Sequence, residues 1–390
     1  MIQSLIDLTL RGSDPARPEV RQRCGALAGR VGIGANVLLF LLKFLCGVFT
    51  GSVAMVADAV NNLSDAAGSV VTLIGFRLAG QEADADHPFG HGRMEYISGF
   101  LVSVAILLMG FELLKSSVQS LFEPKAAVFS PLVCLLLLFA IGVKLFLWRF
   151  NARLGAVIGS AAMAATAADS LSDCAATAAV LLSSFAGQFT DLPVDGAAGI
   201  LVSLFIFKAG WDSLKATMDP LLGRPMDPAL AKEIDELAVS HEYILGIHDL
   251  VYHDYGPGRA MVSFHAEVSA DEDLLTIHDI IDHIERELKA KYHIEAVIHM
   301  DPVVMDERTL ALRQQVTALV KAIGPELSIH DFRITAGPLH TNLLFDLVIP
   351  YDYPLPADVV RACVTQEIKA LSDRLCGGNW QTHKGHKAGL

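Results

Sequence analysis

Long apolar stretches dominate the chain up to about residue 222, and beyond that point short apolar blocks alternate with charged residues. A helix needs about 20 mostly apolar residues to cross a hydrocarbon layer of about 30 Å. Six stretches meet this requirement, and we predict a transmembrane helix over each: about 28–50, 54–79, 95–118, 128–150, 156–186 and 196–218. The second and fifth are the least apolar and are rich in small residues, which let helices pack closely in lipid. We expect these two helices to lie centrally in the bundle.

The remainder of the chain predicts a soluble α+β structure. Helical and strand patterns alternate in the order typical of a small open-faced αβ sandwich, over residues 228–240, 247–253, 260–268, 274–291 and 294–300. A second copy is expected to follow, flanked by helices 307–323 and 356–375, because three features recur in order: Ile247-His248-Asp249 as Ile329-His330-Asp331, Gly256-Pro257 as Gly337-Pro338, and Phe264 as Phe345.

Basic residues indicate the orientation of the helices, because short cytoplasmic loops carry an excess of Lys and Arg. The first and fifth connections have none, and the third is flanked by Lys115 and Lys125. The opposite side carries Arg11, Arg17, Arg21, Arg23, Arg30, Arg77, Arg93, Arg149 and Arg153. Both termini are therefore predicted to be cytoplasmic, with the protein in the cell (inner or plasma) membrane.

Composition supports a membrane protein and excludes some functions. Of the 390 residues, 52% are hydrophobic and 19% charged, against about one quarter charged in ordinary soluble proteins. The net charge of −13 argues against a nucleic-acid binder, since those usually carry a basic face. The six cysteines form no C-x-x-C pair, so we interpret them as packing residues in a reducing compartment.

Two pairs of polar residues interrupt the predicted membrane helices. Asn61 and Asp65 lie four residues apart in the second stretch, and Asp169 and Asp173 lie four apart in the fifth, so each pair shares a helix face. Ionisable groups inside a membrane are costly and face a cavity or a partner. Carboxylates gathered in lipid would repel one another unless a cation joined them. We predict a divalent-metal site here; the alternative is a set of neutral, hydrogen-bonded residues that hold the helices together.

The chemistry of these ligands bears on which metal is bound. All four side chains offer oxygen, which suits Mg, Ca and Mn, whereas imidazole and thiolate suit Zn, Cu and Ni. Manganese is therefore favoured over zinc, and iron(II) stays possible. A different class, an intramembrane aspartyl protease, would need a G-x-G-D context, which neither Asp65 nor Asp173 has.

Histidines and carboxylates form two further candidate metal sites. Asp84, His87 and His91 lie in the second connection and together span eight residues, a spacing that allows a small metal site. The alternative is a solvated loop whose histidines cap the next helix. In the soluble part, the candidates lie at strand ends or on the helix: His248, His265, His278, His299 and Asp301. Taken singly, each of these histidines is better explained as a surface or core residue, but as a set they suggest a metal site.

Residues 25–302 resemble the cation diffusion facilitator family of divalent-metal exporters. The resemblance rests on the two polar pairs, on the loop H-P-F-G-H-G-R, on Pro193-Val194-Asp195-Gly196, and on the series I-H-D, H-A-E-V and I-H-M-D-P of the soluble part. It implies a transport site at Asn61, Asp65, Asp169 and Asp173, a loop site at Asp84, His87 and His91, and a cytoplasmic binuclear site at the five residues named above. Zinc-type members have Asp and His where this chain has Asn61 and Asp169, a departure that resembles the manganese-exporting branch.

The resemblance also implies the mechanism and the domains. We expect a proton-coupled exporter, not an enzyme, that works by alternating access as a homodimer, with divalent metal as substrate and regulator and no catalytic cofactor. The expected domains are a cytoplasmic segment 1–25, a six-helix membrane domain 26–220, a ferredoxin-like cytoplasmic domain 221–304, a second such repeat 305–380, and a tail 381–390. A zinc or iron(II) exporter and a non-transporting metal sensor are the alternatives. Arg93 and Asp219 are a candidate ion pair.

Overall fold

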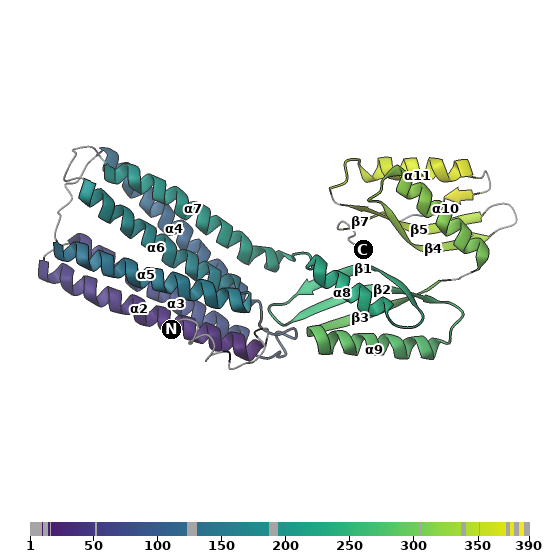
Figure 1. The fold of residues 1–390 in the computed structure, drawn as a ribbon, viewed down its shortest axis with the longest axis horizontal. Helices are drawn as coiled ribbons and strands as arrows, with labels where there is room; N and C mark the ends of the chain where they lie inside the picture. The colour runs from purple at the N-terminus through teal and green to yellow at the C-terminus, as the bar shows by residue number, and fades with distance from the viewer. Residues whose placement is uncertain are drawn as a thin grey trace. The chain divides into compact units, whose positions relative to one another are not determined.

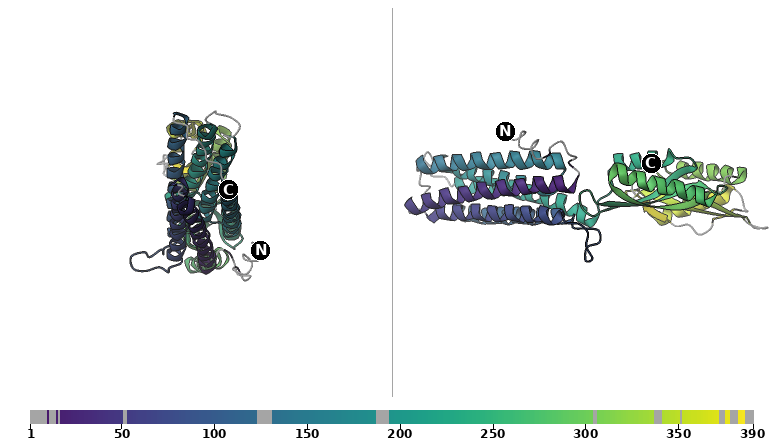
Figure 2. Two further views of the ribbon diagram at one scale, coloured as in Figure 1. Left: turned by 90° about the vertical axis from the view of Figure 1, so that its left-hand side faces the viewer. Right: turned by 90° about the horizontal axis from the view of Figure 1, so that it is seen from below.

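The structure is a computed structural model in which the chain forms two compact units (Figures 1 and 2). One contains residues up to Arg224 together with Asp254–Arg259, and the other contains Pro225–His253 and the residues from Ala260 onward. The described residues are 10, 15, 17–50, 53–122, 131–186, 194–303, 306–336, 341–350, 352–371, 375–377 and 382–385. The Gly337-Pro338 motif and Pro193 lie outside them, as do residues 1–9, 11–14 and 16 of the predicted segment 1–25 and residues 381 and 386–390 of the predicted tail 381–390.

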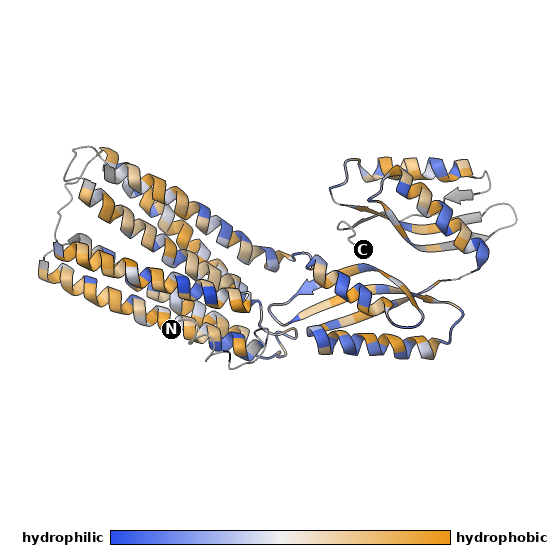
Figure 3. Cartoon of the chain, in the orientation of Figure 1, coloured by the Kyte–Doolittle hydropathy of each residue, from blue (hydrophilic) through white to orange (hydrophobic). Residues whose placement is uncertain are grey.

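Six long helices form the first unit and lie over the six apolar stretches. They are α2 (Pro18–Thr50), α3 (Val53–Ala79), α4 (Met94–Phe122), α5 (Pro131–Ile158), α6 (Ala161–Ala186) and α7 (Val194–Leu222). Among the described residues, α2, α4, α5 and α7 are long and apolar enough to cross a membrane, and many of their residues have the orange colour of hydrophobic residues in Figure 3. The helices extend beyond the predicted spans because hydrogen bonding along the backbone can continue outside the apolar layer.

Small residues bring the helices of this bundle close together. The α6 helix contacts α3, α4, α5 and α7, which agrees with the central position expected for the fifth stretch. At Gly99 on α4, an added Cβ would lie 2.8 Å from the Cα of Ala162 on α6 and 2.7 Å from Cγ2 of Thr217 on α7. The absence of a side chain at Gly99 therefore sets the distance between these three helices.

A buried ion pair joins three parts of the bundle. The Arg21 guanidinium on α2 donates to Glu95 Oε1 on α4 at 2.7 Å, and the Ser160 hydroxyl, between α5 and α6, donates to the same oxygen at 2.6 Å. Arg21 also donates to the carbonyl of Ile158 at the end of α5. Since a buried charge without partners is strongly destabilising, these bonds fix how the helix ends meet.

The turn over residues 255–259 belongs to the helical unit. Arg93, just before α4, donates through Nε and Nη2 to the backbone carbonyl of Asp254 at 2.9 and 2.7 Å. Tyr96 on α4 donates its hydroxyl to Asp254 Oδ2 at 3.1 Å. The suggested pair of Arg93 with Asp219 was therefore wrong: the guanidinium is directed to a carbonyl that the sequence pattern did not single out.

The second unit contains two sheets, each with helices on one face. In the first, α8 (Pro228–Val239) and α9 (Leu274–Tyr292) pack on the strands β1 (Ile244–Asp254), β2 (Ala260–Ser269) and β3 (Ile294–Val303), in the order β1-β2-β3. The strands β2 and β3 are parallel, which requires a crossover such as α9. Alternate residues of β2, including Val262, Phe264 and Ala266, are buried against the helices.

The same order of helices and strands follows a second time in the chain. The elements are α10 (Glu307–Ile323), β4 (Ser328–Ala336), β5 (Thr341–Pro350), α11 (Ala357–Leu371), β6 (Leu375–Gly377) and β7 (Thr382–Gly385). The strand β5 is antiparallel to β4 and parallel to both β6 and β7. Its alternate residues Leu343, Phe345, Leu347 and Ile349 face a core shared with α10 and α11.

The close approach at Gly99 gives a testable prediction. Gly99→Ala should lower the apparent thermal midpoint of the protein in detergent, because the new methyl group would force α4 away from α6 and α7, at about 1–3 kcal/mol for overpacking. Gly34→Ala on α2 is the matched control, since no atom lies within 4 Å of a Cβ built there. In the interior of a helix, alanine is also more favourable than glycine by about 1 kcal/mol. Equal midpoints for the two variants would contradict the described packing.

Candidate metal centres

Three aspartates of the bundle form a compact group. Asp65 comes from α3, and Asp169 and Asp173 come from α6, where they lie one helical turn apart. Carboxylate oxygens of the three residues lie within 4.8 Å of one another. The fourth candidate, Asn61, lies one turn before Asp65 on α3, and its side chain is exposed.

A lysine that was not identified from the sequence lies in this group. The ammonium of Lys144 on α5 donates to Asp65 Oδ2 at 2.7 Å and to Asp173 Oδ2. Its side chain is 5% exposed, so water screens this charge little. The signal was available, because a basic residue inside the fourth apolar stretch calls for a partner, but the sequence argument considered only side chains that can bind a cation.

The arrangement determines what the group can do chemically. Three carboxylates face one ammonium, so with all of them ionised the negative charges exceed the positive charge by two. A divalent cation supplies that missing charge, and carboxylate oxygens are suitable ligands for a hard cation. Because Lys144 contacts the same oxygens, an incoming cation and the ammonium would compete for Asp65 and Asp173.

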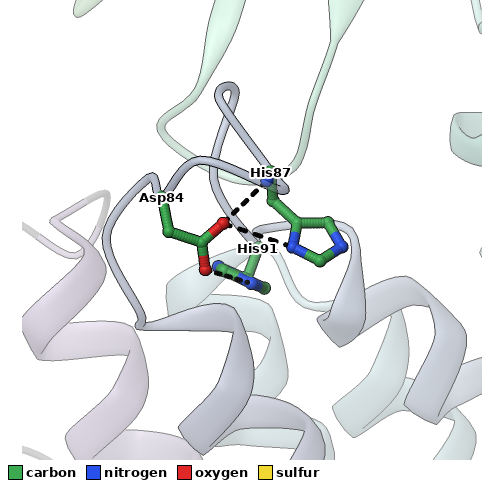
Figure 4. A group of neighbouring side chains, drawn as sticks. All are labelled: Asp84, His87 and His91. Carbon is green, nitrogen blue, oxygen red and sulfur yellow. Dashed lines mark hydrogen bonds and ion pairs between the residues drawn. The ribbon is translucent and has the colours of Figure 1, made fainter.

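The loop candidates Asp84, His87 and His91 lie together before α4 (Figure 4). Asp84 Oδ1 is 3.4 Å from His87 Nδ1, and Asp84 Oδ2 is 3.5 Å from His91 Nε2. The backbone N–H of His87 donates to Asp84 Oδ1 at 2.7 Å and holds the pKa of this exposed carboxyl below its usual range. His91 Nδ1 lies 3.2 Å from the Glu82 carbonyl, which leaves Nε2 directed to Asp84. Both rings can therefore offer nitrogen to an ion beside Asp84.

Strand register brings most of the cytoplasmic candidates together. His265 and His299 are direct neighbours on β2 and β3, and Asp301 follows two residues later. Asp301 is almost fully buried: its Oδ2 lies 2.9 Å from His265 Nδ1 and 3.2 Å from His248 Nε2, and its Oδ1 lies 3.3 Å from His299 Nε2. Three imidazoles thus surround one carboxylate.

The fifth cytoplasmic candidate lies elsewhere. His278 on α9 is exposed and lies 3.6 Å from Asp282 of the same helix; it is not part of the group around Asp301. Two groups that sequence reasoning did not single out are present: His241 with His283 and Glu287, and His248 with Asp249 and His330. In the second, the imidazoles of His248 and His330 hold the pKa of the Asp249 carboxyl well below its usual range.

Comparison with known proteins identifies the chain. Residues 30–222 match the model of the cation efflux transmembrane domain, and residues 226–303 match the cation efflux protein cytoplasmic domain. The manganese efflux system protein MneS of Bacillus subtilis is 30% identical over 282 residues, which cover 72% of this chain and 96% of that protein. The chain belongs to the cation diffusion facilitator family.

Other relatives in the family are similar at comparable identity. The cation-efflux pump FieF of Shewanella oneidensis is 28% identical over 73% of this chain and 96% of its own length. The manganese efflux system protein MneP of Bacillus subtilis is 25% identical over 72% of this chain and 97% of its own length. As a family member the protein is a membrane-embedded transporter that exports divalent cations, and it is not an enzyme. The protease and the non-transporting sensor are thereby excluded.

The contact of Lys144 with the bundle aspartates predicts how this site responds to substitution. Lys144→Met should tighten Mn²⁺ binding by about tenfold or more, because the competing charge is removed and two charges 4 Å apart interact by about 4 kcal/mol even where screening is considerable. Titration of the purified protein in detergent measures this. Lys208→Met, which removes an exposed lysine paired with Asp212 on α7, is the control. Unchanged or weaker Mn²⁺ affinity in Lys144→Met would contradict the competition.

Proposed function

We propose that the protein exports Mn²⁺ in exchange for protons. The observation that carries this proposal is the donor set of the bundle: Asp65, Asp169 and Asp173 offer carboxylate oxygen, with no His or Cys in the group. Oxygen ligands suit Mn²⁺ better than Zn²⁺. The names of the relatives MneS and MneP, both manganese efflux proteins, support the same metal. Asn61 completes the transport site in this proposal as a fourth oxygen ligand.

The proposed cycle follows from the charges in the bundle. Mn²⁺ enters from the cytoplasm and takes the carboxylates that Lys144 contacts in the metal-free site. When the bundle opens outward, protons replace the metal, because clustered carboxylates without a cation bind protons more readily. Proton entry down its gradient returns the bundle to its first state. Lys144 limits the repulsion between the carboxylates while neither metal nor protons are bound.

The remaining architecture is part of the same proposal. All six helices cross the membrane, with α3 and α6 shielded from lipid by the more apolar helices, and both termini are cytoplasmic. Residues 221–304 and 305–380 are ferredoxin-like repeats; the order helix, strand, strand, helix, strand, present twice, supports this. The protein works as a homodimer, as the match to the family's cytoplasmic domain suggests.

The two histidine-containing groups predicted from the sequence regulate transport in this scheme. Asp84, His87 and His91 bind metal beside the bundle, and His248, His265, His299 and Asp301 bind it in the cytoplasmic domain, with His278 as a ligand only if α9 moves. These imidazoles favour zinc or iron(II), and they are the observation that supports the alternative of a zinc or iron(II) exporter.

Transport into inverted membrane vesicles with an imposed proton gradient tests the proposal. Mn²⁺, Zn²⁺, Fe²⁺ and Mg²⁺ are supplied separately, and uptake is measured with and without the gradient. Mn²⁺ uptake that exceeds that of the other ions and collapses with the gradient is expected. Faster transport of Zn²⁺ than of Mn²⁺ would refute Mn²⁺ as the exported ion. An uptake rate that is the same with and without the proton gradient would refute the exchange for protons.

The donor set also predicts how selectivity can be changed. Asp169→His replaces one oxygen ligand with imidazole, so the ratio of Zn²⁺ to Mn²⁺ transport should rise by about tenfold, equivalent to ~1.4 kcal/mol. The same vesicle assay measures the ratio. Asp212→His on α7 introduces a histidine at an exposed position outside the group and should leave the ratio unchanged. Identical ratios in both variants would count against Asp169 as a ligand.

A further inference from the structure

A histidine of the second repeat contacts the strand of the first repeat that carries His248. His330 on β4 is buried, and its Nε2 lies 3.3 Å from Asp249 Oδ1 on β1. The rings of His330 and His248 are stacked, with centroids 4.1 Å apart. These two histidines occupy equivalent positions of the two Ile-His-Asp sequences, so the repeats meet at the same motif.

A second contact holds the repeats in this arrangement. Arg313 on α10 donates through Nη2 to both oxygens of Glu267 on β2, at 2.9 and 2.7 Å. The Glu267 side chain is buried, so this is a charge-assisted contact at a protected position. The contact of His330 with His248 and Asp249 is therefore part of an interface between the two repeats that the pair of Arg313 and Glu267 also stabilises.

The environment of His248 is not that of an ordinary core histidine. Its side chain is 9% exposed, and neither ring nitrogen makes a hydrogen bond within the described part of the chain. Nδ1 faces Asp249 Oδ2 at 3.8 Å and Nε2 faces Asp301 Oδ2 at 3.2 Å. Buried imidazole nitrogens normally have hydrogen-bond partners, so this ring can offer a nitrogen to an ion beside the carboxylates it faces.

The spacing of the three side chains fits a metal ion. One donor atom each from His248, Asp249 and His330 lie within 4.8 Å of one another. Ligands of a tetrahedral ion at 2.0–2.2 Å are separated by roughly 3.4 Å, so small rotamer shifts would suffice. The backbone of Asp249 also has a positive φ of 53°, a conformation that costs free energy in a residue other than glycine and here places the carboxylate beside His330.

We propose that His248, Asp249 and His330 bind a divalent cation of the zinc type, and that this ion fastens the second repeat to the first. Two nitrogens and one carboxylate oxygen form a donor set for borderline metals, unlike the all-oxygen group of the bundle. A neutral imidazole has a single lone pair, so His248 serves either this ion or one beside Asp301. The two cytoplasmic positions therefore compete for His248.

Zinc titration of the full chain in detergent, against a chromophoric chelator, tests the site. His330→Ala and Asp249→Asn should each weaken one Zn²⁺ equivalent by about tenfold or more, the size seen when a supporting group of a metal site is lost. His253→Ala is the control, because His253 lies on the same strand and is exposed. His299→Ala weakens the group around Asp301, which competes for His248. In this variant the Zn²⁺ ion at His248, Asp249 and His330 should therefore bind with the same affinity as in the unaltered protein or a higher one.

Hydrogen–deuterium exchange tests the attachment of the repeat. Zn²⁺ should slow exchange over β4, residues 328–336, in the unaltered protein and in His253→Ala but not in His330→Ala. Comparing the exchange of β5 between variants in the absence of metal shows whether the second repeat is folded in each. If the second repeat is not folded in His330→Ala, His330→Gln is used in its place. Unchanged Zn²⁺ affinity and unchanged protection of β4 in the His330 variant would overturn the proposal.

The test of the second-repeat site does not depend on which ion the protein exports. Asp65→Ala should abolish vesicle transport and leave the Zn²⁺-dependent protection of β4 intact, so a failure of the proposed export and a failure of the second-repeat site give different results.

Discussion

Charges inside the helical bundle must be paired, and this constraint orders the membrane part of the protein. Lys144 on α5 reaches Asp65 on α3 and Asp173 on α6. Lys43 on α2 pairs with Asp58 on α3 at 2.8 Å, and its side chain is almost fully buried. Each pair joins different helices. An ammonium left buried without its carboxylate partners would cost about 3–5 kcal/mol. The positions of these charges along the helices therefore determine how the helices align.

The sequence predicts the helices and carboxylates well, because both depend on local periodicity. Apolar runs specify α2 to α7, and the spacing of Asp169 and Asp173 places them on one face of α6. The sequence does show Lys144 as a basic residue inside the fourth apolar stretch, but which helices it faces is a tertiary property that no spacing within one helix reveals. The exposure of Asn61 was missed for the same reason: sharing a face with Asp65 does not require sharing its partners.

The cytoplasmic group depends on information that the sequence holds only indirectly. His265, His299 and Asp301 come together because β2 and β3 are parallel in a particular register, and a shift of one residue would turn them to the other face. His278 lies on α9, whose apolar face is buried and whose polar face is exposed, so its position follows from the helix and not from the metal ligands. The recurrence of Ile-His-Asp indicated a repeat, but only the packing of β4 near β1 brings His330 to Asp249.

The lysine in the bundle has a consequence for the energy source of transport. With the carboxylates of Asp65, Asp169 and Asp173 ionised, Lys144 leaves two uncompensated negative charges, which one divalent ion or two protons would neutralise equally. Under the proposed exchange, each loaded form of the site is electrically neutral. The membrane potential, which is worth about 2.3 kcal/mol per charge per 100 mV, then does no work on the cycle. Export would be electroneutral and would continue in a depolarised cell for as long as a pH difference remains.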